Sequence, residues 1–371
     1  MPWRDRYAAI RDRWLSDPRF QRWAAAFPLT RRTARRRARA LFDLCAGFVY
    51  SQILYACVRL GLFDLLAAGP QSAAAIAKAL NLTPDSAELL LDAAVSLDLA
   101  DRRHGGRFGL GSLGAALVGN PAVGAMVEHH RLLYTDLNDP VRLLRGEQGK
   151  TQLARYWAYA DSKTPARLSH ARTADYTDLM ANSQPLVAGE ILDAYPLNAH
   201  RCLLDVGGGD GSFLIEAARR HAQLELILFD LPAVVKQATE RFEKSGIASR
   251  ACAVGGDFLI DPLPGSADVV SLVRVVHDHG DEAARSLLRS VHCALVPQGV
   301  LLLAEPMLGT PGAETVGDAY FSFYLLAMGT GRPRSPDQLK RMLTEAGFRR
   351  PRVVPTRQPL QTCLILAHKD L

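Results

Sequence analysis

The sequence lacks any uninterrupted apolar run long enough to cross a bilayer. Its longest apolar run, residues 44–58, covers 15 residues and still contains Ser51 and Gln52. A membrane-spanning helix needs about 20 apolar residues, so we expect no transmembrane segment. The N-terminal residues alternate in charge, and no apolar signal core follows them, which predicts a cytoplasmic chain.

Cysteine is sparse and scattered, and no C-x-x-C pair occurs. This pattern argues against a disulfide framework and a structural zinc site, so we expect reduced, mostly buried thiols and no metal. The six cysteines are Cys45, Cys57, Cys202, Cys252, Cys293 and Cys363.

Lysine is also scarce, with 7 Lys against 37 Arg, and the arginines are unevenly placed. Residues 1–40 hold 12 Arg and 3 Asp, a net charge of +9, which leaves −3 for the other 331 residues. We therefore distinguish a basic N-terminal arm, residues 1–39. Such an arm could contact anionic lipid, nucleic acid or an acidic partner surface, and it is equally compatible with a solvated helix face.

With 371 residues, 48% of them apolar, the chain can form two domains with cores of their own. Residues 40–120 show short helical runs and then two strands around a His-Gly-Gly turn, which predicts a winged-helix-like domain. A long apolar helix is predicted over residues 40–58. Along residues 44–58 it is apolar on more than one face, so we expect it to pack against a second subunit.

The remaining chain divides into a connecting part and a larger domain. Residues 121–195 are predicted to be connecting helices, whose aromatic side chains either pack or form the wall of a pocket. Residues 196–371 alternate strands and helices, which predicts an α/β domain with a doubly wound, mostly parallel sheet. Ligands of such sheets bind beyond the carboxyl ends of the strands.

A glycine-rich turn, LLDVGGGDGS at residues 203–212, joins the first strand of this sheet to its helix. Because glycine lets a ligand approach the backbone closely, Gly207 and Gly209 are candidate cofactor residues. The turn matches neither the dinucleotide pattern G-x-G-x-x-G nor a phosphate loop, which disfavours pyrophosphate but not a ligand with ribose and adenine.

Two carboxylates follow at the ends of the next strands. Asp230 lies 23 residues after Gly207, the place from which a carboxylate binds both ribose hydroxyls. Asp257 could accept a hydrogen bond from the amino group of adenine, and the Phe258 ring could lie against the base. Together these residues indicate a nucleoside site.

This combination resembles the class I methyltransferases that bind S-adenosylmethionine. The segment VVHDHGDE at residues 275–282 is similar to H-D-W-x-D-E of the plant-type small-molecule O-methyltransferases, whose histidine is catalytic. The resemblance extends from about residue 40 to the end of the chain. It implies S-adenosylmethionine as cofactor, Arg274 beside it, His277 as the catalytic residue and a homodimer formed through the N-terminal domain.

The sequence departs from that family at two positions. His279 replaces the family's tryptophan, and Pro333 replaces the second of two glutamates that flank the catalytic histidine. The first glutamate matches Glu305. We therefore expect Glu305 to orient His277 alone, or another group to share this task.

The N-terminal part narrows the resemblance. The segments FQRW (20–23), FPLTR (27–31), LFDL (41–44) and AGFVYSQ (46–52) are similar to the bacterial carotenoid O-methyltransferases of the spheroidene pathway. This resemblance implies a lipophilic acceptor, the tertiary 1-hydroxyl of an acyclic carotenoid. Because such an acceptor dissolves in bilayers, we expect the basic arm to touch an anionic membrane, the inner photosynthetic one, peripherally.

The chemistry needs a base, because a hydroxyl is a poor nucleophile while it keeps its proton. A neutral imidazole at His277 could take that proton, and Glu305 could hold its tautomer. A metal pair with His279 is disfavoured, since alternate residues of an extended segment face opposite ways. The predicted helix at 320–328, with Tyr134 and Met180, either walls the acceptor site or packs in the core.

Two other functions stay open. One is a related C-methyltransferase that acts on a bacteriochlorophyll precursor. The other is a winged-helix nucleic-acid-binding protein, but its candidate recognition helix, residues 85–97, contains acidic and apolar side chains and no Lys or Arg. We therefore expect no nucleic-acid partner.

Overall fold

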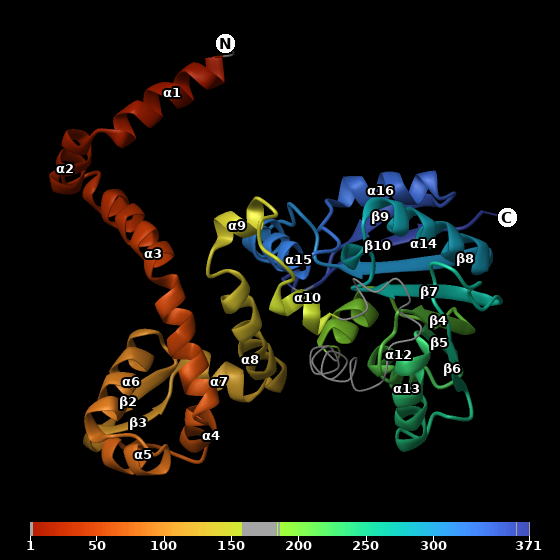
Figure 1. Cartoon of the computed structure of the whole chain (residues 1–371), viewed down its shortest axis with the longest axis horizontal. Coiled ribbons are helices and arrows are strands. Elements are labelled where there is room, and N and C mark those ends of the chain that lie inside the picture. The colour runs from red at the N-terminus through yellow and green to blue at the C-terminus, as the bar shows by residue number, and fades with distance from the viewer. Residues whose placement is uncertain (1–2, 158–183, 185, 361, 371) are drawn as a thin grey trace. The chain divides into compact units, whose positions relative to one another are not determined.

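The computed structural model describes residues 3–157, 184, 186–360 and 362–370. The chain divides into two compact units, Met1–Asn120 and Pro121–Leu371, and each is described by itself. Figure 1 follows the chain through both units.

The N-terminal unit is mostly helical. Side-chain caps begin two of its helices, since Ser72 and Thr83 accept hydrogen bonds from the backbone N–H groups of Ala75 and Ser86. Its described helices are α1 (Trp3–Ser16), α2 (Pro18–Ala26), α3 (Arg31–Arg59), α4 (Leu62–Ala67), α5 (Ala73–Ala79), α6 (Pro84–Ser96), η1 (His104–Gly106) and α7 (Ser112–Val118).

Helix α3 is longer than the apolar run that predicted it, because the arginine cluster forms its first turns. Of the described helices it alone is long and apolar enough to cross a bilayer, although Ser51 and Gln52 interrupt the run. Length and composition alone are weak evidence for a membrane span, since the core helix of a soluble protein or a signal sequence passes the same test. Cys57 is the one buried residue within α3, while Leu44 and Phe48 are 81% and 70% exposed.

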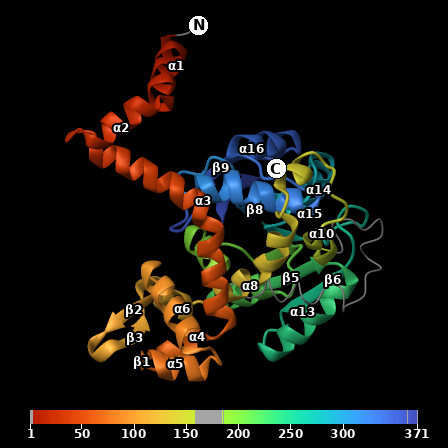
Figure 2. The ribbon, with the colours of Figure 1, turned by 60° about the vertical axis from the view of Figure 1, so that its left-hand side comes forward.

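The predicted wing gains a third strand. Strands β2 (Ala100–Arg103) and β3 (Arg107–Leu110) pair antiparallel around Gly105, whose φ of 73° suits the turn. The additional strand, β1 (Gln71–Ser72), pairs with β3 and is too short for its sequence to show alternation. Figure 2 shows this wing beside α4, α5 and α6, which share its apolar core.

The second unit is built around a seven-stranded sheet in the order β6-β5-β4-β7-β8-β10-β9. The first five strands in this order are parallel, and β10 runs antiparallel to both of its neighbours. The doubly wound, mostly parallel sheet is therefore confirmed. Its strands are β4 (Cys202–Val206), β5 (Glu225–Asp230), β6 (Ala251–Gly255), β7 (Ala267–Val273), β8 (Leu295–Glu305), β9 (Arg349–Val354) and β10 (Cys363–His368).

Helices cover both faces of this sheet (Figure 1). Apolar side chains of α12 (Ser212–Arg220), α13 (Pro232–Lys244) and residues 186–194 pack on one face. Those of α14 (Asp281–Ala294) and α16 (Pro336–Glu345) pack on the other. The further named helices of the described residues are α8 (Pro121–Asp136), α9 (Pro140–Leu144), α10 (Gln152–Tyr156), the 3-10 helix η3 (Val276–Asp278), the π-helix η4 (Thr315–Phe321) and α15 (Ser322–Met328).

Strand register brings the predicted site residues to one edge. Val206 pairs with Phe229, and Asp230 pairs with Gly255, so β4, β5 and β6 end side by side. Asp230 is the last residue of β5, and the glycine turn and Asp257 lie in the loops that follow β4 and β6. The parallel sheet therefore gathers residues that lie far apart in sequence.

Candidate active site

The glycine turn leaves β4 in a backbone conformation that requires glycine. Gly207 and Gly209 have φ of 71° and 60°, in the left-handed region. A Cβ on Gly207 would lie 2.8 Å from a methyl group of Val275, whereas one on Gly209 would meet nothing within 4 Å. The turn is therefore closed toward the protein at Gly207 and open at Gly209.

Asp230 is fixed to this turn through backbone hydrogen bonds. The Gly209 N–H donates to Asp230 Oδ2 at 2.8 Å, and the Leu231 N–H donates to Oδ1 at 2.7 Å. Burial raises the pKa of Asp230 to about 6, although these two donors oppose the shift. The carboxylate is thus held beside the turn, where a ribose diol of the predicted cofactor would lie.

Asp257 and Phe258 follow the next strand. The Leu259 N–H donates to Asp257 Oδ1 at 3.0 Å, which fixes this buried carboxyl group. The Phe258 ring meets His279 edge-on, with centroids 5.3 Å apart. His279, the replacement for the family's tryptophan, therefore packs on the ring that is predicted to contact adenine.

Asp205 also belongs to this edge and was not among the predicted site residues. Its Oδ1 accepts a 2.6 Å hydrogen bond from Ser271, but its buried Oδ2 has no hydrogen-bond partner among the described residues. Burial raises its pKa to about 7. A Cβ on Gly208 would lie 2.5 Å from that Oδ2. An unsatisfied carboxylate oxygen beside an open glycine turn fits a cationic nucleoside cofactor. Its place two residues before Gly207 was the signal in the sequence.

Arg274 adopts a strained backbone at the end of β7. Its φ is 57°, uncommon for a residue with a side chain, and its N–H donates to Ala304 O at 2.7 Å. The guanidinium donates to Gln184 Oε1 at 2.9 Å. Arg274 therefore links the predicted catalytic segment to the strand that carries Glu305.

His277 and Glu305 are brought together as predicted, in a site that is almost closed to solvent. Glu305 Oε2 accepts the backbone N–H of His277 at 3.0 Å and lies 3.7 Å from its Nδ1. Glu305 is 0% exposed and His277 is 6% exposed. Glu305 thus fixes the backbone of His277 and faces one side of its ring.

Asp278 faces the other nitrogen, which the sequence reasoning did not anticipate. Its Oδ1 lies 3.0 Å from His277 Nε2, in contact but without hydrogen-bond alignment. Burial would lower the pKa of His277, but Asp278 and then Glu305 outweigh it and raise the pKa above the ordinary 6.5. The pKa of Glu305 is likewise raised, by burial. Asp278 is therefore a second carboxylate beside the ring where Pro333 provides none.

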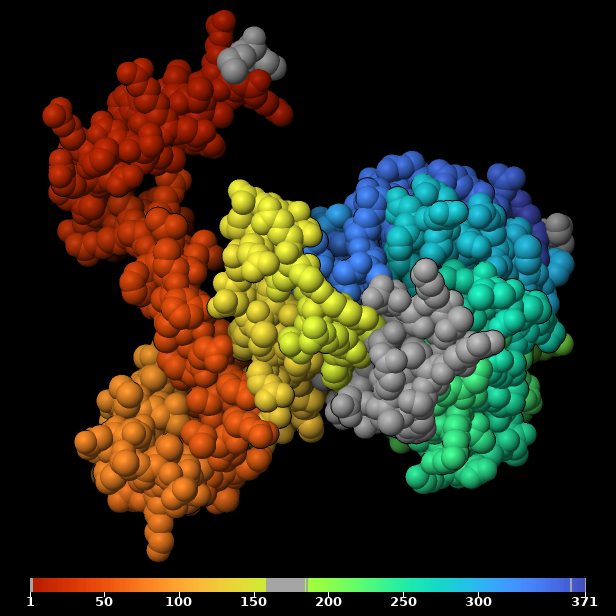
Figure 3. Space-filling model, in the orientation of Figure 1, coloured from red at the N-terminus to blue at the C-terminus, as the bar shows by residue number. Residues whose placement is uncertain are grey.

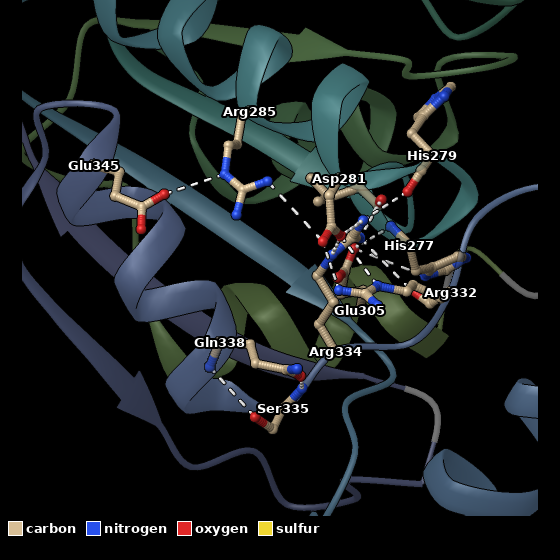
Figure 4. Close-up of polar contacts among 11 residues, drawn as sticks. His277, His279, Asp281, Arg285, Glu305, Arg332, Arg334, Ser335, Gln338 and Glu345 are labelled. Atoms are coloured by element: carbon tan, nitrogen blue, oxygen red, sulfur yellow. Dashed lines mark hydrogen bonds and ion pairs between the residues drawn. The ribbon is translucent and has the colours of Figure 1, made fainter.

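The segment that contains Pro333 instead holds the backbone around His277, as Figure 4 shows. The Arg334 guanidinium donates to Val276 O at 2.9 Å and to His279 O at 2.7 Å. Its Nη2 also lies 2.9 Å from Asp281 Oδ1, and Arg334 is fully buried. This fork therefore ties the residues before and after His277 to the start of α14.

One backbone hydrogen bond and one side-chain ion pair complete this arrangement. The Arg332 N–H donates to His277 O at 2.8 Å, and Arg332 Nη2 lies 2.5 Å from Asp281 Oδ2. Gly331 has a φ of 75°, and a Cβ there would lie 2.2 Å from His277 O. Burial would raise the pKa of Asp281, but Arg334 and Arg332 hold it below its ordinary value. We call Gly331, Arg332, Arg334 and Asp281 the loop clamp.

Aromatic side chains of η4 and α15 lie beside His277 or in a neighbouring core. The Phe321 ring is 6.0 Å from the His277 ring, centroid to centroid. Tyr324 pairs with buried His129 at 2.8 Å, and Tyr320 pairs with His130 at 2.7 Å. Tyr324 of α15 thus packs in a core, and Phe321 at the end of η4 faces the predicted base. A wall of the acceptor site formed by this segment stays a prediction. Met180 lies outside the described residues.

Comparisons with known proteins agree with this geometry. The model of the O-methyltransferase domain matches residues 134–349, and that of the O-methyltransferase dimerisation domain matches residues 42–120. Demethylspheroidene O-methyltransferase of Cereibacter sphaeroides is 43% identical over 349 residues, 94% of this chain and 92% of that protein. Acetylserotonin O-methyltransferase of Mus musculus is 34% identical over 344 residues, 86% of each chain.

Solved structures agree as well. Human N-acetylserotonin methyltransferase in complex with S-adenosylmethionine superimposes with a TM-score of 0.75 at 28% identity, covering 90% of this chain and 98% of that one. The class I methyltransferase fold, the cofactor and the N-terminal dimerisation domain predicted from the sequence are thereby confirmed. The chain belongs to the O-methyltransferase family and is an S-adenosylmethionine-dependent O-methyltransferase.

Proposed function

We propose that this enzyme methylates the tertiary 1-hydroxyl of an acyclic carotenoid, with His277 as general base. The observation that carries the reaction is the buried imidazole of His277 between two carboxylates, at the sheet edge that holds the cofactor turn. The substrate class is supported by the 43% identity to a protein named for demethylspheroidene. It is also supported by the aromatic ring of Phe321 beside the base.

The reaction needs one proton removed and two reactants aligned. S-adenosylmethionine supplies a methyl group on a positively charged sulfur. As the oxygen–methyl bond forms and the sulfur–methyl bond breaks, the hydroxyl proton passes to Nε2 of His277. Glu305, on the Nδ1 side, stabilises the imidazolium that results.

Asp278 sets a condition on this step. Its Oδ1 lies 3.0 Å from the same Nε2, so the acceptor hydroxyl must displace or share that contact. Glu305 and Asp278 both favour the charged ring, which makes His277 a stronger base but leaves less of it neutral. The loop clamp keeps the ring at one position, because productive alignment is lost with small displacements.

Product analysis tests the substrate. The enzyme is incubated with S-adenosylmethionine labelled at its methyl group and a detergent-dispersed panel of hydroxylated pigments, and products are identified by mass spectrometry. We expect label in a methyl ether of the acyclic carotenoid carrying a tertiary 1-hydroxyl. Label in an aromatic or indole alcohol alone would contradict the proposed substrate.

A bacteriochlorophyll precursor in the same panel tests the alternative of carbon methylation. A methyl group on carbon survives ether cleavage, whereas a methoxy group does not. Because the family match and its named relatives are O-methyltransferases, we expect no carbon-bound label. A winged-helix nucleic-acid function has less support, since α6 carries Asp85, Glu88 and Asp92 on a helix without Lys or Arg.

We also infer a homodimer. The dimerisation model begins at residue 42, inside α3, and Leu44 and Phe48 on this helix are exposed in the single chain. Burying such side chains against a second subunit is favourable by about 25 cal/mol per Å² of apolar surface. Light scattering should give twice the mass of one chain.

Because a lipophilic acceptor dissolves in the bilayer, the methylation reaction would take place at a membrane surface. We therefore infer peripheral contact with the inner photosynthetic membrane, made by the basic arm, and no nucleic-acid partner. The arm's net charge of +9 over residues 1–40 supports this contact. Sedimentation of the enzyme with isolated membranes, and its release by salt, tests the location.

A further inference from the structure

We propose that α1 is an interfacial helix that lies in the surface of an anionic bilayer with one defined face. Four large side chains, Trp3, Tyr7, Ile10 and Trp14, follow the spacing i, i+4, i+7, i+11. At 100° per residue this spacing places all four within a stripe about 60° wide. They are between 58% and 75% exposed in the described part of the chain. Figure 3 draws α1 at the red, N-terminal end of the chain.

Arginines border this stripe on both sides. Arg4 and Arg11 lie about 80–100° to one side of Trp3, and Arg6 and Arg13 lie about 60–80° to the other. The Arg4 guanidinium is 5.6 Å from the Trp3 ring centroid. Aromatic rings at the level of the headgroups, with flanking cations that reach the phosphates, are the arrangement that interfacial helices use.

The acidic residues of α1 lie on the opposite face. Asp5 and Asp12 are about 180–200° from Trp3, so they would point away from a bilayer that receives the stripe. Asp12 forms an exposed ion pair with Arg11 at 2.7 Å. The helix thus has an aromatic stripe with two cationic borders, and its back combines Asp5 and Asp12 with Ala8, Ala9 and Leu15. The cationic borders fit an anionic surface better than a neutral one.

The aromatic surface continues into α2. Trp14 meets Phe20 edge-on at 5.3 Å, and Trp23 stacks on Phe27 at 5.0 Å. A groove here is lined by three aromatic residues, two arginines and one aspartate: Trp14, Phe20, Trp23, Arg13, Arg19 and Asp17. Rings beside guanidinium groups suit the glycerol and phosphate region of a lipid.

A nucleic acid or a second copy of the chain fits this face less well. Groove binding by a helix needs basic and polar side chains at its centre, whereas the centre here is apolar. A second copy would bring identical arginine borders into contact around the stripe, and like charges repel. A bilayer instead accepts the apolar centre and both cationic borders together.

Vesicle co-sedimentation of the full-length enzyme tests the face. Vesicles of phosphatidylglycerol with phosphatidylcholine are compared with phosphatidylcholine alone. Replacing both tryptophans (Trp3→Ala with Trp14→Ala) should weaken binding about tenfold or more. Replacing two border arginines (Arg4→Gln with Arg11→Gln) should weaken binding to the anionic vesicles about tenfold and reduce its salt dependence.

Two control variants distinguish binding through the stripe and its arginine borders from effects of any surface substitution. Leu89→Ala removes a side chain that is 74% exposed on α6, outside the arm, and should leave binding unchanged. Asp5→Asn with Asp12→Asn alters the back of the helix and should not weaken binding. Quenching of tryptophan fluorescence by brominated lipids, lost in the double tryptophan variant, would place the indoles in the bilayer.

Three results would overturn the proposal. If the double tryptophan variant binds vesicles as tightly as the native enzyme, the stripe is not the binding face. If the double tryptophan variant has a lower mass in light scattering than the native enzyme, the face binds a second copy of the chain. If the native enzyme binds duplex DNA and this variant does not, the face binds nucleic acid. Turnover of a detergent-dispersed acceptor is measured in parallel, so failure of the carotenoid substrate remains distinguishable from failure of membrane binding.

Discussion

The two units of this chain place their charged and aromatic side chains in opposite ways. In the catalytic unit, Glu305 and Arg334 are fully buried, and each is held by named donors or acceptors. In the N-terminal unit, Trp3 and Trp14 are exposed along a helix bordered by arginines. Buried charges act on one neighbour and shift its pKa, whereas exposed charges act weakly on many partners. The first arrangement suits chemistry and the second suits a surface.

The largest expected effect comes from removing the base. His277→Ala should lower kcat by about 10²–10⁴, the usual contribution of general base catalysis, while cofactor affinity stays unchanged. Initial rates with labelled cofactor and calorimetric binding measure the two quantities. His292→Ala is a control, since His292 packs edge-on against Phe348 away from the site. Full turnover by His277→Ala would favour carbon methylation, which needs no hydroxyl deprotonation.

The next effect separates cofactor binding from chemistry. Asp230→Asn should weaken S-adenosylmethionine binding by about 10–100-fold, because a charged hydrogen-bond acceptor is worth about 1.5–3 kcal/mol. At saturating cofactor, kcat should change little. Asp268→Asn is the matched control, because Asp268 accepts backbone N–H groups of Arg201 and Cys202 at the opposite edge of the sheet. Equal cofactor affinity in both variants would remove Asp230 from the site.

The loop clamp should give a smaller effect on rate. Arg334→Lys keeps the charge but cannot bridge Val276 O, His279 O and Asp281 together, so we expect kcat to fall about tenfold. The pH midpoint of His277 should also move, which a loss of stability alone would not cause. Stability itself should fall by about 1–3 kcal/mol in denaturant titrations.

Arg332→Lys is the control for this variant. Arg332 pairs with the same Asp281, but its side chain is 55% exposed, and surface pairs contribute about 1 kcal/mol or less. We expect its rate to stay within threefold of the native enzyme. Equal rates for both variants would show that the clamp does not position His277.

The sequence predicted the parts of this site that follow from strand and turn pattern. Gly207 and Asp257 each follow a strand, Asp230 ends one, and parallel register brings the strand ends together. The clamp was not predictable in this way, because Arg334 reaches carbonyls more than 50 residues earlier in the chain. Asp278 was visible beside His277, but only its side-chain direction shows that it faces Nε2.

The N-terminal unit shows a similar limit. The stripe of α1 follows from helical spacing alone, whereas strand β1, two residues long, appears only through its pairing with β3. The start of α3 was placed too late, because the arginine cluster hid the helical continuity of residues 31–40. Local pattern therefore predicts elements and faces, and it misses contacts that depend on tertiary pairing.

The smallest expected effect is a shift along the pH axis. A general base must be neutral, so kcat/KM should rise with pH as His277 loses its proton. Burial lowers the pKa of His277, but Asp278 and Glu305 outweigh it, so the midpoint should lie above 6.5. Rates across pH, with cofactor saturating, measure this midpoint.

Glu305→Gln removes one of these carboxylates while its amide oxygen can still accept the His277 N–H. The pKa of His277 should then fall, so the rising limb of the pH profile of kcat/KM moves to lower pH. The plateau of that profile should drop, because the imidazolium loses its stabilising charge. Asp278→Asn should move the limb in the same direction and leave the Nδ1 side intact. A limb that moves to higher pH in either variant would contradict the assignment of the base. A buried carboxylate shifts the pKa of its neighbour far more than an exposed one does. Removing the exposed ion pair of Arg11 and Asp12 should therefore leave the pH dependence of kcat/KM unchanged.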